Sequence, residues 1–181
     1  MAVHCMIDLE TGSIQLDCMI LSIGIVKFNP VTETIIDTLY IKPSLEDQEA
    51  LGRIIDDGTA DWWVSQPAHN SEEAWSDVDR IPYIEALEQL QQFVWNSDYV
   101  WSNGANFDIP VISQAMMSAK MNTPWDFYKA RDTRTIYEIA KVKLSDDKHV
   151  TTHNALEDAI HQTKILFRAY KKLIALGIEM K

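Results

Sequence analysis

The sequence predicts an α/β protein with a mixed β-sheet flanked by helices. Three apolar stretches near the N-terminus are joined by short connections, which is typical of an antiparallel meander. Amphipathic helical patterns then alternate with short apolar stretches, which favours helices packed on the same sheet. A length of 181 residues with 46% hydrophobic content predicts one domain over residues 1–181, large enough to bury a core.

Five strands are expected. Residues 3–8 and 19–28 are apolar runs of strand length, and residues 34–42 form the third strand of the meander. Residues 98–103 form a fourth, short strand, and residues 129–133 are the candidate for a fifth strand of the predicted sheet.

Helical spacing of apolar residues predicts four main helices, over residues 82–94, 108–120, 133–142 and 155–176. The first of them begins with Pro82, which is favoured in the first turn of a helix. Residues 44–80 are acidic and irregular in pattern, with a short helix expected only at residues 61–66.

Charge and cysteine content restrict the class of protein. The net charge is −11, divided into −14 for residues 1–100 and +3 for residues 101–181, so any contact with a polyanion is expected to involve the second half. Cys5 and Cys18 indicate small buried side chains in a reducing compartment rather than a disulfide or zinc site. With no signal-peptide pattern and no apolar run near 18 residues, we expect a soluble cytoplasmic protein that does not contact membranes.

Two carboxylates end the first predicted strand. Asp8 and Glu10 are two residues apart, and this spacing places both side chains on one face of a strand. Like charges in a partly dry site repel each other. The pair therefore predicts a ligand of opposite charge.

Asp108 follows a short apolar strand and a polar turn containing Gly104, and it precedes a predicted helix. This position is compatible with a functional carboxylate at the end of a strand. An ordinary helix N-cap is the alternative, because Asp is a preferred capping residue.

His153 and Asp158 are five residues apart, and on one continuous helix they would point about 140° away from each other. They can converge if Asn154 is the N-cap, with Glu157 at the position of a capping-box partner. His153 would then lie in the loop and Asp158 in the first turn. A helix start with two incidental polar residues is the alternative.

These four carboxylates and one imidazole suit hard divalent ions such as Mg²⁺ or Mn²⁺. Two ions about 4 Å apart can bind the attacking and leaving oxygens of a phosphoryl displacement, and a nearby histidine can accept a proton from water. The set predicts that the carboxylates hold divalent metal ions.

The three motifs "IDLET", "NGANFD" and "HNALEDA" occur in the order found in DnaQ-like 3′–5′ exonucleases, and the chain resembles their DEDDh branch. The resemblance implies a ribonuclease H-like fold with a five-stranded mixed sheet. It also implies that Asp8, Glu10, Asp108 and Asp158 are metal ligands and that His153 is the general base. His149 and His161 are rivals for that role.

Further stretches resemble the subgroup of phage exonuclease A-type enzymes and a mycobacterial exoribonuclease. They are "DWWVSQ", with Trp62 and Trp63, and "ARDTR", with Arg131 and Arg134. The tryptophans either stack on a terminal base or pack in the core, and the arginines either meet phosphates or form surface ion pairs. The family also implies terminal-nucleotide contacts near Thr11 and Phe107.

The resulting hypothesis is a 3′–5′ exonuclease that releases nucleoside 5′-monophosphates from the 3′ end of single-stranded nucleic acid. DNA is slightly favoured and RNA is the alternative. An endonuclease of the ribonuclease H type and a non-catalytic nucleic-acid-binding module are the rival hypotheses. A homodimer is a possible assembly because relatives often form dimers.

Overall fold

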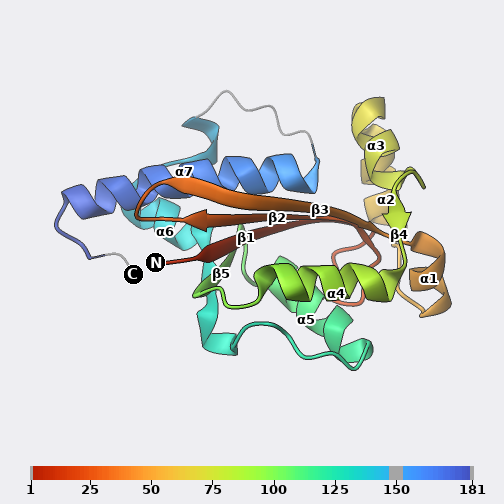
Figure 1. Ribbon diagram of the computed structural model, residues 1–181. Coiled ribbons are helices and arrows are strands. Elements are labelled where there is room, and N and C mark those ends of the chain that lie inside the picture. The colour runs from red at the N-terminus through yellow and green to blue at the C-terminus, as the bar shows by residue number, and fades with distance from the viewer. Residues whose placement is uncertain (1, 147–152, 180–181) are drawn as a thin grey trace.

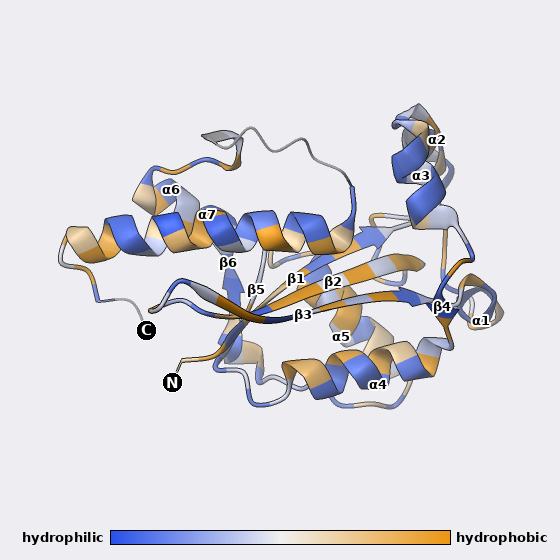
Figure 2. Ribbon diagram, turned by 45° about the horizontal axis from the view of Figure 1, so that its top comes forward, coloured by the Kyte–Doolittle hydropathy of each residue, from blue (hydrophilic) through white to orange (hydrophobic). Residues whose placement is uncertain are grey.

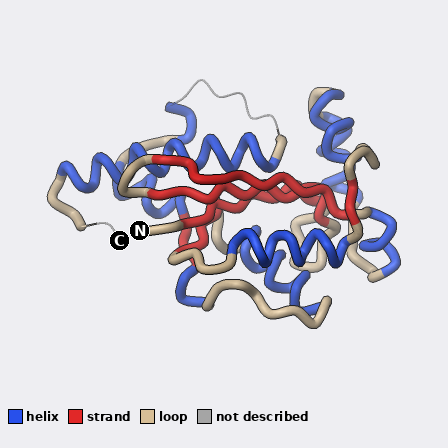
Figure 3. Tube along the Cα trace, viewed as in Figure 1, coloured by secondary structure: helices blue, strands red, loops and turns tan. Residues whose placement is uncertain are grey.

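The computed structural model describes residues 2–146 and 153–179, and in it one twisted sheet lies between two layers of helices (Figures 1 and 3). Helices α6 (Thr133–Ala140) and α7 (Ala155–Ala175) cover one face. Helices α4 (Tyr83–Val94) and α5 (Asp108–Ser118) cover the other. The predicted α/β class with a mixed sheet flanked by helices is confirmed.

The sheet has the strand order β4-β3-β2-β1-β5-β6. Strands β1, β2 and β3 form the predicted antiparallel meander, while β5 runs parallel to β1, and β6 runs parallel to β5. The strands are β1 (His4–Thr11), β2 (Ile20–Asn29), β3 (Thr34–Pro43), β4 (Arg80–Ile81), β5 (Tyr99–Ser102) and β6 (Ala130–Asp132).

The sheet therefore has six strands. The prediction of five strands was wrong because it missed the edge strand β4. This strand has two residues, too few to show any alternation of apolar and polar side chains. It pairs in parallel with the end of β3. The Arg80 side chain holds it there by donating hydrogen bonds to the carbonyl oxygens of Leu21, Pro43 and Ala74. These contacts are tertiary, so the local sequence does not reveal them.

The acidic segment at residues 44–80 is also more helical than predicted. It contains α1 (Leu45–Ala50), α2 (Asp57–Ser65) and α3 (Ala68–Trp75). The side chains of Ser44 and Asp56 cap α1 and α2. Short one-turn 3₁₀ helices, η1 (Phe127–Lys129) and η2 (Leu144–Asp146), complete the described elements.

Strand β1 is buried on both faces, and its alternation assigns each residue to one layer. Cys5, Ile7 and Leu9 pack with α4 and α5, whereas Met6 packs with α6 and α7. Asp8 and Glu10 continue the row of Met6, so both carboxylates lie on the α7 face. The apolar colouring of β1 and β2 and the two-sided colouring of α4 and α7 agree with this layering (Figure 2).

Cys5 and Cys18 are both buried and free, in keeping with their prediction as small core side chains.

No helix within residues 2–146 and 153–179 combines the length and apolar character needed to cross a membrane.

Gly24 allows α7 to approach the sheet closely. It pairs with Asp8 across β1 and β2. A Cβ atom at this position would lie 2.2 Å from both the carbonyl carbon and the carbonyl oxygen of Ala155, the first residue of α7. These are backbone atoms, so only a residue without a side chain permits the first turn of α7 to rest on β2 beside Asp8.

Gly24→Ala should therefore lower the free energy of unfolding by about 1–3 kcal/mol, the usual cost of overpacking a core. Chemical denaturation followed by circular dichroism measures this change. Gly58→Ala is the matched control, because a Cβ there would meet only the Asp56 side chain, at 3.2 Å. Equal stability of Gly24→Ala and the unmodified protein would contradict the close approach.

Candidate active site

Asp8 and Glu10 lie near the C-terminal end of β1, on the face covered by α7. A register shift follows between Glu10 and Thr11, where the strand leaves regular pairing with β2. The pair is thus held by a strand at the centre of the sheet, with the chain turning away immediately after it.

The start of α7 brings a histidine and a third carboxylate to this pair. Asn154 is the N-cap, as predicted, and its Oδ1 accepts hydrogen bonds of 3.1 Å from the backbone amides of Leu156 and Glu157. His153 precedes the cap with a left-handed φ of 50°. One ligand atom from each of Glu10, His153 and Asp158 lies within 4.8 Å of the others. These three side chains form a group able to bind a metal ion.

Asp108 is the first residue of α5 and is buried, while Phe107 occupies the N-cap position. The interpretation of Asp108 as an ordinary N-cap is therefore wrong. Burial raises the pKa of the Asp108 carboxyl to about 7, although its own backbone amide, the Leu9 backbone and the charge of Arg134 oppose this shift. The helix start thus places a fourth carboxylate against β1.

The four carboxylates lie close enough to affect one another's pKa, so they form one cluster. Burial raises the pKa of Glu10 to about 8, with further contributions from the charges of Asp158, Asp108 and Glu73. Burial also raises the pKa of Asp8 well above its ordinary value, followed by the charges of Asp108 and Glu10. Such a set is stable in its charged form only with a cation nearby.

Gln162, which the sequence analysis missed, contacts Asp8 directly. Its Nε2 donates a 2.7 Å hydrogen bond to Asp8 Oδ1. Gln162 lies four residues after Asp158 on α7, so both side chains project from the same face of the helix. The signal in the sequence was a glutamine four residues after Asp158, a spacing that places it beside a candidate metal ligand on the helix.

A pocket of about 340 Å³ adjoins Glu10. Its lining includes four residues that the family resemblance placed at the substrate, and these are Thr11, Trp62, Trp63 and Phe107. Ile14, Gly58 and Thr59 complete the wall together with Leu9 and Glu10. The structure thus gathers residues from β1, α2 and the turn before α5 around one cavity next to the carboxylates.

The two tryptophans have different environments. Trp63 is 2% exposed, and its indole Nε1 donates a 3.0 Å hydrogen bond to the Thr11 carbonyl, so it is a core residue. Trp62 is 40% exposed, and its ring meets His153 edge-to-face at a centroid distance of 4.8 Å. Trp62 therefore leaves surface available to a ligand, while both rings restrict the orientation of the His153 imidazole.

The two arginines lie apart from each other. Arg134 lies near Gly104, and a Cβ atom built at Gly104 would lie 3.5 Å from the guanidinium carbon of Arg134. The charge of Arg134 lowers the pKa of Asp108. Arg131 lines a different pocket, beside His4 at the opposite end of β1. Its guanidinium covers the Tyr99 ring and donates to the backbone carbonyls of Tyr128 and Ala130. The structure brings Arg134 to the carboxylate cluster and does not bring Arg131 there.

The rival histidines differ in position. The Nε2 atom of His161 lies 3.2 Å from the Leu144 carbonyl oxygen, away from the grouping of His153 with Glu10 and Asp158. His149 lies outside the described residues.

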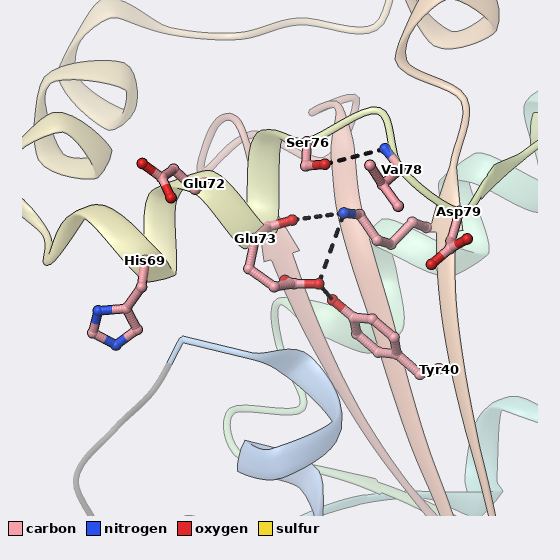
Figure 4. Close-up of a pocket in the computed structure, with 8 residues that line it drawn as sticks. Tyr40, His69, Glu72, Glu73, Ser76, Val78 and Asp79 are labelled. Atoms are coloured by element: carbon pink, nitrogen blue, oxygen red, sulfur yellow. Dashed lines mark hydrogen bonds and ion pairs between the residues drawn. The ribbon is translucent and has the colours of Figure 1, made fainter.

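A second pocket of about 490 Å³ lies between β3 and α3 (Figure 4). Tyr40 donates a 2.6 Å hydrogen bond to Glu73 Oε1, and the buried Lys42 donates to the Glu73 carbonyl at 2.7 Å. These contacts join α3 to β3. They also fix Glu73, whose charge contributes to the raised pKa of Glu10.

Glu10→Gln should stabilise the metal-free protein. The pKa of Glu10 is about 8 in the fold against an ordinary value of 4.5, so its ionisation destabilises the folded state above pH 4.5. The gain in Tm should be absent below that pH, grow up to about pH 8 and then stay constant. Each 1 kcal/mol of added unfolding free energy raises Tm by about 2–4 °C in a protein of this size.

Thermal unfolding in EDTA across this pH range measures the effect of Glu10→Gln. Glu88→Gln, at an exposed position of α4, is the control and should leave Tm unchanged at every pH. A pH-independent difference between Glu10→Gln and the unmodified protein would contradict the repulsion described above.

Comparisons with known proteins agree with this architecture. The family model of the 3′–5′ exoribonuclease Rv2179c-like domain matches residues 3–169. No curated protein matches the sequence. Among solved structures, the nuclease domain of 3′hExo, a DEDDh family member bound to rAMP, has a TM-score of 0.60 at 14% identity, over 99% of this chain and 94% of that one.

The E. coli ExoI–ssDNA complex in its zinc-bound form has a TM-score of 0.68 at 12% identity, over 97% of this chain and 43% of that one. The cell-death related nuclease CRN-4 has a TM-score of 0.57 at 15% identity, over 97% and 64% of the two chains. At such identities these structures establish a shared fold. From the family match, the chain belongs to the Rv2179c-like 3′–5′ exoribonuclease domain family, whose members are 3′–5′ exonucleases.

Proposed function

We propose that this 3′–5′ exonuclease removes nucleotides from the 3′ end of a single strand at the carboxylate cluster. Asp8, Glu10, Asp108 and Asp158 would hold two divalent ions, Mg²⁺ or Mn²⁺. The grouping of Glu10, His153 and Asp158 within 4.8 Å carries the proposal. The charge of Asp108, which raises the pKa of both Asp8 and Glu10, adds to it.

The donor set fits hard divalent ions. It consists of carboxylates and one imidazole, and the two cysteines are buried and free. Carboxylate oxygens are the ligands that Mg²⁺ and Mn²⁺ prefer. When bound, such ions supply Lewis-acid stabilisation of charge on the phosphoryl and leaving oxygens.

His153 is proposed to accept the proton of the attacking water. Its ring lies beside Glu10 and Asp158 and is held by edge contacts with Trp62 and Trp63. A base held in one orientation needs no further ordering when the water arrives. The residues of the pocket at Trp62 and Phe107 would bind the terminal nucleotide, with Trp62 as a stacking surface.

Two hypotheses concern the sugar of the substrate, DNA and RNA. The sequence slightly favoured DNA, whereas the description of the matched family names RNA. Proteins of this fold have been solved with rAMP and with ssDNA.

We further propose that residues 1–181 act as one exonuclease domain. The homodimer stays a prediction, and sedimentation analysis would check it.

Single-stranded RNA and DNA of one sequence, labelled at the 5′ end, test the proposal. With Mn²⁺ or Mg²⁺, a ladder of products shortened from the 3′ end is expected, and a circular strand should resist. Asp158→Asn and Asp8→Asn should abolish release of mononucleotides while the protein stays folded, because each removes a charged ligand. Full activity of either variant would refute the assignment.

His153→Gln should lower kcat by about 10²–10⁴-fold, the usual contribution of a general base, with little change in KM. The glutamine keeps a polar side chain against Trp62 but cannot take up the proton. Steady-state kinetics on the preferred strand measures the change, with His161→Gln as the control. A larger loss in His161→Gln than in His153→Gln would transfer the role to His161.

A further inference from the structure

Gln162 is a buried side chain whose only described hydrogen bond joins it to the carboxylate cluster. The residue is 5% exposed, and its Nε2 lies 2.7 Å from Asp8 Oδ1. Its Oε1 is also buried and has no hydrogen-bond partner among the described residues. Since a buried amide without partners is costly, the hydrogen bond to Asp8 offsets part of the cost of burying Gln162.

The direction of this hydrogen bond matches a charged Asp8. An amide N–H is a donor, and a hydrogen bond from a neutral donor to a carboxylate is stronger than one between neutral groups. With the amide turned over, its oxygen would face the carboxylate oxygen and repel it. The geometry is therefore suited to Asp8 in the form that binds cations.

Helix α7 also couples Gln162 to a second carboxylate of the cluster. Asp158 and Gln162 are one turn apart on the same face, and the helix is anchored on β2 at Gly24. The start of α7 thus contributes one candidate ligand itself and fixes another, Asp8, which belongs to β1. This arrangement sets the position of Asp8 relative to Asp158.

We propose that Gln162 is a positioning residue that holds the Asp8 carboxylate in its cation-binding orientation through the 2.7 Å hydrogen bond. The inference rests on the proposed metal-dependent function and adds a residue to it. Loss of a hydrogen bond that orients a metal ligand usually lowers metal affinity about 10–100-fold. The alternative is a purely structural role, in which Gln162 only stabilises the packing of α7 on β1.

Two substitutions remove the contact in different ways. Gln162→Met keeps a similar volume without a donor, and Gln162→Asn keeps the amide but shortens the side chain by one methylene. Gln48→Met is the matched control, because Gln48 is also buried, but its amide bonds to the backbone of Ile20 and Ser44. It should lower Tm without affecting the carboxylate cluster.

Titration calorimetry of Mn²⁺ into the metal-free full chain at 25 °C gives the decisive measurement, together with Tm and steady-state kinetics. We expect both Gln162 variants to bind Mn²⁺ about 10–100-fold more weakly than the unmodified protein, with a lower kcat and an unchanged KM for the strand. Gln48→Met should bind Mn²⁺ with unchanged affinity.

Unchanged Mn²⁺ affinity in folded Gln162→Met and Gln162→Asn would overturn the inference while leaving the proposed function intact. Unfolding of both variants at 25 °C would also overturn it, in favour of the structural role. If the unmodified protein itself neither bound Mn²⁺ nor shortened a strand, the proposed function would fail first.

Discussion

The contact between the first turn of α7 and β2 at Gly24 is the constraint on which the candidate site depends. Asp8 and Glu10 belong to the first strand, whereas His153 and Asp158 lie almost 150 residues later in the chain. A residue with a side chain at position 24 would separate the two groups, because its Cβ would occupy the space of the Ala155 carbonyl. The convergence of the motifs therefore rests on a residue that carries no chemistry itself.

The same close packing explains why the site is electrostatically unfavourable without a cation. Burial is the largest cause of the raised pKa of Asp8, Glu10 and Asp108, and mutual repulsion adds to it for Asp8 and Glu10. Three described side chains act in the opposite direction. The amide of Gln162 lowers the pKa of Asp8, and the Ser102 side chain and the charge of Arg134 lower that of Asp108. In the proposed function, bound cations supply the remaining compensation, so the stability of the site and its activity depend on the same ions.

The sequence predicted several features that local rules determine. Alternation along a strand placed Asp8 and Glu10 on one face, and the capping preference of Asn154 separated His153 from the helix that carries Asp158. Features set by contacts between distant segments were missed. Strand β4 exists because Arg80 reaches three carbonyl groups of other segments, and Gln162 matters because Asp8 lies opposite it. Arg131 shows the same limit, since Tyr99 and two carbonyl groups retain its guanidinium far from the cluster.

The neighbouring tryptophans show how one short helix can serve both core and pocket. Consecutive residues on a helix point about 100° apart, so Trp63 can reach the Thr11 carbonyl while Trp62 faces the opening beside His153. The buried indole thereby ties α2 to the strand that carries Glu10, and it fixes the position from which the exposed indole meets the imidazole. Because Trp63 bonds to Thr11, one residue after Glu10, the hydrogen bond joins the pocket wall directly to the strand that carries the carboxylates. In the proposed function, a terminal base stacked on Trp62 would be placed relative to Glu10 by this contact between α2 and β1.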